Sequence, residues 1–135
     1  MFDTKNISQG DRWKQDDGIE IAISGFDKGK PAIYVIRGYV NGKLQSVTDA
    51  GATASSAERL GKETRYASKI MERPRKGWIA EWAVPLNALG LKTKPDMETA
   101  FNISAFINEY DNWHCWEGTQ GETWQVAEAG MLRFR

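Results

Sequence analysis

Alternation of apolar and polar residues predicts strands along most of this chain. In residues 19–24 the isoleucines share one face, and Glu20, Ala22 and Ser24 share the other. Residues 77–84 alternate in the same way, with Trp78 and Trp82 on one face. The remaining strands are expected over residues 32–40, 43–47, 66–71, 101–110 and 131–134.

Glycine, proline and asparagine mark the turns between these strands. A Gly-rich turn is expected over residues 27–31, and Asn41-Gly42 predicts a two-residue hairpin, since both residue types tolerate a positive φ. Short helical turns are expected near residues 54–60 and after Pro85. Short strands with little helix predict an all-β fold, namely a two-sheet antiparallel β-sandwich that forms a single domain over residues 1–135.

Composition restricts the partners of the chain. With 18 basic and 18 acidic residues, the formal net charge is zero, which argues against nucleic acid because phosphate binding needs an uncompensated basic surface. No run reaches the roughly 18 apolar residues of a membrane helix, so no membrane partner is predicted. Cys115 is the only cysteine, and an internal disulfide is therefore impossible.

The usual catalytic constellations are missing from the sequence. The only histidine, His114, is adjacent to Cys115, and neighbours on an extended chain point to opposite faces. We therefore predict no catalytic residues and no enzyme activity. One enzymatic alternative stays open, a glycosidase in which Glu20 and Glu81 act as acid and base.

An acidic cluster precedes the first strand. Asp11, Asp16 and Asp17 supply hard oxygen donors that could hold a structural calcium, although their spacing is not that of an EF-hand. A solvated loop is the favoured interpretation. No other cofactor is predicted.

Six tryptophans are many for 135 residues, and they fall in two kinds of setting. Trp78 and Trp82 share a strand face with apolar residues and are interpreted as core. Trp13 and the segment 110–118 instead interleave aromatic rings with amides and carboxylates. Exposed rings with such neighbours suit stacking on a sugar or a protein interface, and the alternative is loop aromatics packed over the sandwich edge.

Three segments carry a likeness to a known family: residues 13–23 (WKQDDGIEIAI), 34–42 (YVIRGYVNG) and 77–90 (GWIAEWAVPLNALG). They resemble family 9 carbohydrate-binding modules and the wider sandwich superfamily that includes haem-binding DOMON-type domains. A looser likeness continues through residues 101–103 and Trp113 to residues 130–132. The resemblance implies a non-catalytic sugar-binding module of a secreted glycoside hydrolase, and hence an extracellular or periplasmic location.

The resemblance also implies where a mono- or oligosaccharide would bind. In sugar-binding members of the family, two tryptophans from opposite sides of a cleft sandwich a sugar ring. Carried over by position, Trp13 would be one of them and Trp113 or Trp116 the other. The expected hydrogen-bonding partners of the sugar are Glu20, Arg37 and Asn112.

Two departures from the family pattern keep other functions open. Ala105 or Ile107 stands where the family often has arginine, and the first family strands have no counterpart, because Met1-Phe2-Asp3 begins just after them. Uncovered sheet edges attract other strands, so we predict a homodimer or strand exchange.

An interaction or assembly domain without sugar binding is the main alternative function. A haem domain is another, with axial ligands drawn from His114 and from Met71, Met97 or Met131.

Overall fold

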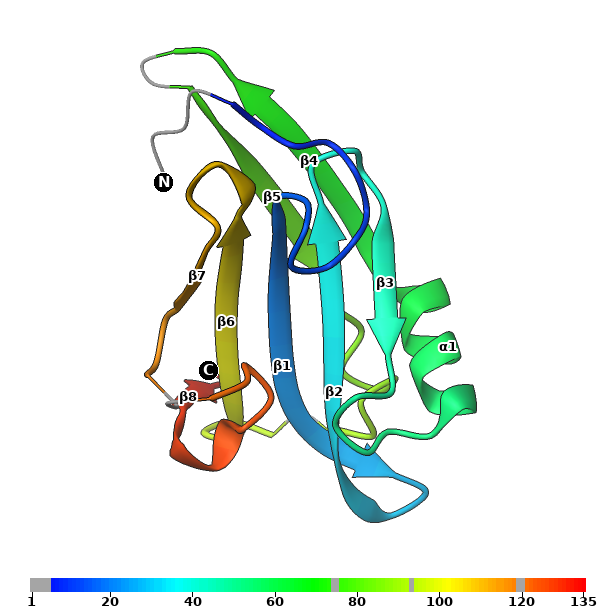
Figure 1. Cartoon of the computed structure of the whole chain (residues 1–135). Helices are drawn as coiled ribbons and strands as arrows, with labels where there is room; N and C mark the ends of the chain where they lie inside the picture. Colours follow the sequence, from blue (N-terminus) through cyan, green and yellow to red (C-terminus); the bar gives the residue numbers. More distant parts are fainter. Residues whose placement is uncertain (1–5, 74–75, 93, 119–120) are drawn as a thin grey trace.

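The computed structural model describes residues 6–73, 76–92, 94–118 and 121–135, and these form a β-sandwich of two antiparallel sheets (Figure 1). The larger sheet, sheet A, has the strand order β3-β2-β1-β6-β7, and β8 also pairs with β6. Strands β4 and β5 form the smaller sheet, sheet B, which lies behind sheet A in Figure 1. The predicted two-sheet antiparallel sandwich is confirmed. Residues 1–5, which include Met1-Phe2-Asp3, lie outside the described residues.

The seven predicted strands form in order, residues 112–115 add one more, and the strand expected over residues 101–110 ends at Ile107. Sheet A consists of β1 (Gly18–Asp27), β2 (Lys30–Tyr39), β3 (Leu44–Val47), β6 (Glu98–Ile107), β7 (Asn112–Cys115) and β8 (Gly130–Arg133). Sheet B consists of β4 (Arg65–Met71) and β5 (Gly77–Ala83). The helical elements are α1 (Ala54–Glu63) and two 3-10 turns, η1 (Asn108–Tyr110) and η2 (Val126–Glu128). None of the described helices is long and apolar enough to cross a membrane.

The two-residue turn lies at the first hairpin and not at the second. Strands β1 and β2 pair along their full length around Lys28-Gly29, whose φ values of 50° and 79° suit a primed hairpin turn. At the second hairpin the prediction of a two-residue turn was wrong, because the Tyr39 N–H donates to the Lys43 carbonyl at 3.0 Å and three residues, 40–42, lie between them. There the Asn41 side chain accepts the Lys43 N–H at 3.0 Å and so takes that donor from the strand ladder.

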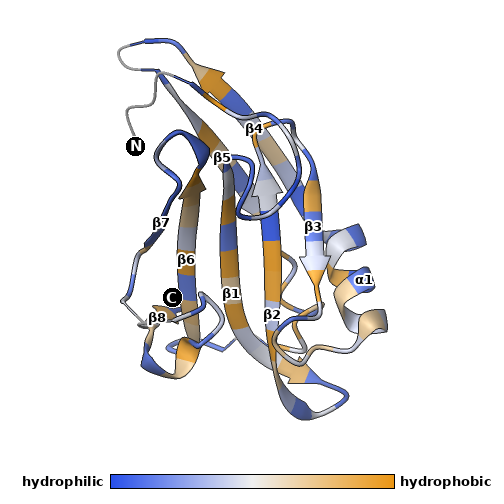
Figure 2. Ribbon diagram, viewed as in Figure 1, coloured by the Kyte–Doolittle hydropathy of each residue, from blue (hydrophilic) through white to orange (hydrophobic). Residues whose placement is uncertain are grey.

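The core lies between the inner faces of the two sheets. Ile21, Ile23 and Ile36 are buried together with Leu60 of α1, and the apolar stripes along β1 and β2 are visible in Figure 2. Trp82 of sheet B packs against this cluster, which confirms its predicted core position. Trp78 is only half-buried.

Gly38 allows the two sheets to approach closely. A Cβ at this position would lie only 2.4 Å from the Tyr66 ring and 2.8 Å from the Trp82 ring. These two rings contact each other with their centroids 5.1 Å apart. The absence of a side chain at Gly38 therefore makes room for the aromatic pair that joins sheet B to sheet A.

Asp27, at the end of β1, fixes the start of α1. Its carboxylate accepts hydrogen bonds from the Ser56 hydroxyl at 2.6 Å and from the Thr53 N–H at 2.9 Å. Thr53 is the N-cap residue, and its own hydroxyl accepts from the Ser56 N–H. The hydrogen bonds from Ser56 and Thr53 lower the pKa of Asp27 to about 2.

Asp27→Asn is expected to lower the melting temperature near neutral pH by an amount that shrinks in acid. Since the folded-state pKa lies below the ordinary 3.8, the stabilisation by Asp27 is present above 3.8 and is lost as the pH falls toward about 2. Thermal melts of both proteins across this range measure the difference. Asp96→Asn, at an exposed aspartate, is the control, and a pH-independent difference for Asp27→Asn would contradict the assignment.

The segment before β1 crosses the outer face of sheet A, and two aspartates hold it there. Asp16 and Asp17 are buried, so the interpretation of a solvated loop was wrong for both. Asp16 accepts from the Ser8 hydroxyl at 2.6 Å and from the Arg12 N–H at 3.0 Å. Asp17 accepts from the backbone N–H groups of Ser8 and Asn108. A loop that lies on a sheet needs acceptors for its own N–H groups, and these carboxylates provide them.

Candidate functional site

The outer face of sheet A, which points away from sheet B, carries a line of polar side chains. The strand register places five residues side by side across β3, β2, β1, β6 and β7, and we call them the polar row: Gln45, Arg37, Glu20, Ser104 and Cys115. Polar groups in the middle of a sheet face are costly to bury unless they are paired. The polar groups of this row that have no partner within the protein are therefore the ones available to a ligand.

Glu20 and Arg37 form a buried ion pair at the centre of the polar row. Glu20 is fully buried, and its Oε2 accepts from Arg37 Nε at 2.6 Å. Arg37 also donates from Nη2 to Asp49 at 2.6 Å. Burial opposes the charge on Arg37, but the two carboxylates outweigh it and raise the pKa of the guanidinium. The second oxygen of Glu20, Oε1, is buried and has no hydrogen-bond partner.

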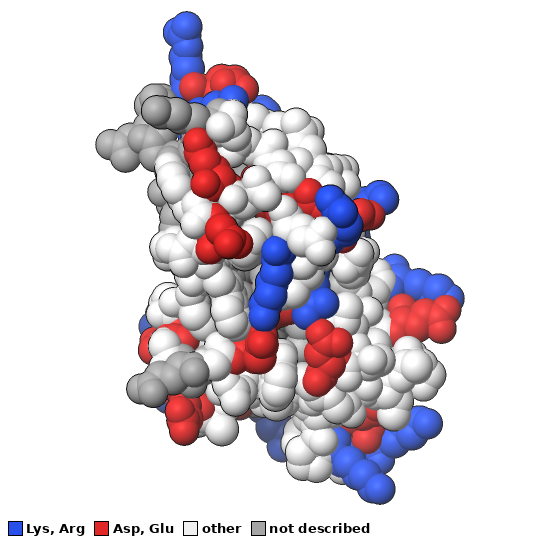
Figure 3. Space-filling model, viewed as in Figure 1, with Lys and Arg blue, Asp and Glu red and all other residues white. Residues whose placement is uncertain are grey.

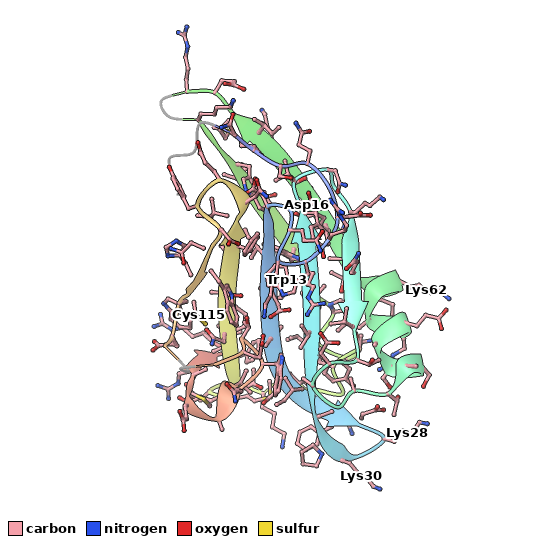
Figure 4. The ribbon with its side chains drawn as sticks, in the orientation of Figure 1. Trp13, Asp16, Lys28, Lys30, Lys62 and Cys115 are labelled. Carbon is pink, nitrogen blue, oxygen red and sulfur yellow. The ribbon has the colours of Figure 1, made fainter. Side chains whose placement is uncertain are left out.

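Trp13 lies over the polar row in front of β1 (Figure 4). Its ring stands over Gly18, where a Cβ would lie 3.2 Å from the indole, so this glycine makes room for it. The guanidinium carbon of Arg37 is 5.2 Å from the ring centroid, a cation–π distance. The indole Nε1 is buried without a partner.

Trp113 lies on the same face, at the edge formed by β7. It pairs with Phe106 on β6 and is half-buried, and its Nε1 is buried without a partner. Lys14 Nζ is 4.7 Å from the centroid of this ring and 3.1 Å from Glu122 Oε1. Trp13 and Trp113 are thus each covered by a cation of the chain itself, and Figure 3 shows basic and acidic atoms alternating across the middle of this face.

A second segment, residues 121–129, covers the lower part of the outer face. The Thr123 and Ser104 hydroxyls share a buried hydrogen bond of 2.6 Å, and Val126 is buried against Ala22 and Val35. Trp124 packs onto the same apolar cluster. The polar row therefore lies between two covering segments, and the Lys14–Glu122 ion pair connects them.

Four of the predicted site residues share this face, and two do not. Trp13, Glu20, Arg37 and Trp113 are on the outer face. Asn112 and Trp116, by strand alternation, point to the opposite side of β7, and the Trp116 ring contacts Phe101 at a centroid distance of 6.1 Å. Residues 112–115 form a strand that was not among the predicted strands, and its alternation separates neighbouring side chains.

Sequence reasoning did not single out several residues of this face, namely Lys14, Asp49, Glu122, Thr123 and Trp124. A signal for one of them was present. Trp124 lies in Gly-Glu-Thr-Trp-Gln, a segment with the same interleaving of aromatic and polar residues that distinguishes Trp13. Lys14 and Asp49 carried no such signal, because only the fold brings Lys14 to the Trp113 ring and Asp49 to Arg37.

The structure does not assemble the glycosidase pair. Glu20 points outward from sheet A, whereas Glu81 is exposed on the far face of sheet B, since its neighbour Trp82 points into the core. The two carboxylates therefore lie on opposite sides of the sandwich. In the described residues, no three His, Cys, Asp or Glu side chains come together in a way that could hold a metal ion.

The candidate haem ligands are also dispersed. Met97 and Met131 line an apolar cavity of about 590 Å³ at the end of sheet A where β1 and β6 separate. His114 is exposed on β7, outside that cavity, and Met71 ends β4 in the other sheet.

Comparisons with known proteins bear on the fold. No family model and no curated protein matches the chain. One solved structure is similar, a Bacteroides uniformis ATCC 8492 protein named as a "putative carbohydrate-binding protein", with a TM-score of 0.61 and 15% sequence identity. The match covers 96% of this chain and 65% of that chain, so this chain spans less than two thirds of its length. At this identity the likeness shows a shared fold.

Removing one partner of the buried ion pair is expected to destabilise the fold strongly. Arg37→Met leaves Glu20 as an uncompensated buried charge. This is expected to lower the free energy of unfolding by about 3–5 kcal/mol. The double variant Glu20→Met/Arg37→Met removes both charges and is expected to recover most of that loss. Urea denaturation measures all three proteins.

Lys43→Ala is the control for this comparison. It breaks the exposed ion pair of Lys43 with Asp11 and is expected to cost less than about 1 kcal/mol. A double variant no more stable than Arg37→Met would show that the charge of Glu20 is not what destabilises the single variant.

Proposed function

We propose that this chain is a non-catalytic carbohydrate-binding module whose ligand binds at the polar row. One observation carries the proposal: Glu20 Oε1 is a buried acceptor without a partner, on the same face as two indole N–H donors without partners. A sugar hydroxyl both donates and accepts hydrogen bonds, and can therefore satisfy groups of both kinds. Buried polar groups without partners are uncommon in folded proteins, and here three of them lie on one face.

The aromatic residues support a sugar over other polar ligands. Trp13 and Trp113 place large apolar rings beside the charged groups, and the C–H faces of a pyranose stack on such rings while its hydroxyls reach the polar neighbours. The likeness to family 9 modules supports the same ligand class. The similar Bacteroides uniformis protein is itself named for carbohydrate binding, which adds support to the class but not to a particular sugar.

Calorimetry against a panel of mono-, di- and oligosaccharides tests the proposal. We expect heat of binding from at least one sugar, and a loss of affinity of about tenfold in Trp13→Ala, since the ring would lose its stacking contact. Trp116→Ala is the matched control, because this exposed tryptophan points to the other side of β7 and should leave affinity unchanged.

The proposal is contradicted if no sugar in the panel gives heat. Equal losses in Trp13→Ala and Trp116→Ala would contradict the placement of the site, although not the ligand class.

A second candidate function is assembly through sheet B. In the described residues β4 and β5 pair only with each other, so the outer edge of each strand is open, and Ile79 on this hairpin is 41% exposed. Open strand edges accept further strands, which favours a homodimer built at this sheet.

Light scattering of the purified protein measures the assembly. A mass twice that of the 15.2 kDa chain is expected, and a monomeric mass at high protein concentration would exclude self-assembly.

A further inference from the structure

One face of Trp113 is occupied by an ammonium group of the chain itself. Lys14 Nζ lies 4.7 Å from the ring centroid, and both Glu122 carboxylate oxygens are within 3.3 Å of the same nitrogen. An aromatic ring and a carboxylate around one ammonium are the groups that recognise a cationic ligand. We call this arrangement the Lys14 clasp.

The backbone at Lys14 is unfavourable for a lysine. Its φ is 59°, in the left-handed region that favours glycine. The neighbouring turn fixes this conformation, because the N–H groups of Gln15 and Asp16 both donate to the Arg12 carbonyl and Asp16 is itself buried. The surrounding turn thus holds Lys14 in a conformation that a lysine adopts at a cost, and from there its side chain reaches the Trp113 ring.

The Lys14 clasp is weak enough for a ligand ammonium to replace that of Lys14. The Lys14 and Glu122 side chains remain 44% and 39% exposed, and ion pairs with this exposure contribute little to stability. Opening the clasp would leave the Glu122 carboxylate beside an uncovered indole face, a site with one positive charge fewer. A ligand ammonium would restore that charge, whereas a neutral hydroxyl would not.

We infer that the sugar bound at this face carries a protonated primary amine, and that this amine displaces Lys14 from between Trp113 and Glu122. The inference rests on the proposed function for the sugar part of the ligand. The amine part is inferred from the Lys14 clasp alone. In this reading Lys14 is an internal competitor that holds the amine site closed until a ligand arrives.

Three proteins and three probes test the inference by calorimetry and tryptophan fluorescence in weakly acidic buffer. The proteins are the unaltered chain, Lys14→Gly and Glu122→Gln, and the probes are glucosamine, glucose and methylammonium chloride. Lys14→Gly removes the competitor and also relieves the backbone strain, so it should fold at least as well as the unaltered chain.

The amine probes should respond to both substitutions. We expect glucosamine to bind more tightly than glucose, and Lys14→Gly to raise the affinity for glucosamine about 5- to 30-fold, because the competing clasp no longer has to open. Glu122→Gln should lower the affinity for glucosamine and leave that for glucose unchanged. Lys43→Ala, which removes another exposed ion-paired ammonium, is the control and should change neither affinity.

The possible failures are distinguishable. Equal binding of glucose and glucosamine, unaffected by Lys14→Gly, would overturn the amine inference and leave sugar binding in place. Binding of methylammonium to Lys14→Gly with no binding of either sugar would support the amine site and overturn the sugar. No response to any probe in Lys14→Gly would overturn both.

Discussion

The buried ion pair between Glu20 and Arg37 is the interaction on which the outer face of sheet A depends. It joins β1 to β2 in the centre of the sheet, and Arg37 extends it to Asp49 in the segment after β3. Burying such a pair has a large desolvation cost that good geometry only offsets, so its main effect here is on position. It holds the guanidinium against the Trp13 ring and thereby fixes the segment that precedes β1.

The rest of the face follows from that anchor. The segment before β1 approaches from one end of the sheet, held by Asp16 and Asp17, and residues 121–129 approach from the other, held by Thr123 and Val126. The first segment places Trp13 over the polar row, and the second bonds to the row through Thr123 and Ser104. Two indole N–H groups and Glu20 Oε1 remain without partners on this face. The same constraint that orders the loops therefore leaves unpaired donors and acceptors together on one face, and a ligand with both donors and acceptors can satisfy them.

Strand alternation made much of this structure predictable. The isoleucines of β1 identified its inner face and put Glu20 on the outer one, and the tryptophans of β5 identified the inner face of sheet B. What could not be predicted depends on contacts between distant segments. Residues 112–115 are too polar to show a strand pattern, and they form an edge strand by pairing with β6. The alternation of this strand places Trp113 on one side and Asn112 and Trp116 on the other. The place of Lys14 in the site could not be predicted either, because it depends on contacts with the distant residues Trp113 and Glu122.

The central claim is that the polar row, between Trp13 and Trp113, is where a ligand binds. Two-dimensional NMR of the ¹⁵N-labelled protein tests it most directly, because each of the six tryptophans gives one indole N–H signal. Titration with a binding saccharide should shift the signals of Trp13 and Trp113, whose N–H groups gain an acceptor, and leave those of Trp78, Trp82 and Trp116 in place. Shifts confined to Trp116 or to the sheet B tryptophans would place the ligand elsewhere and contradict the account.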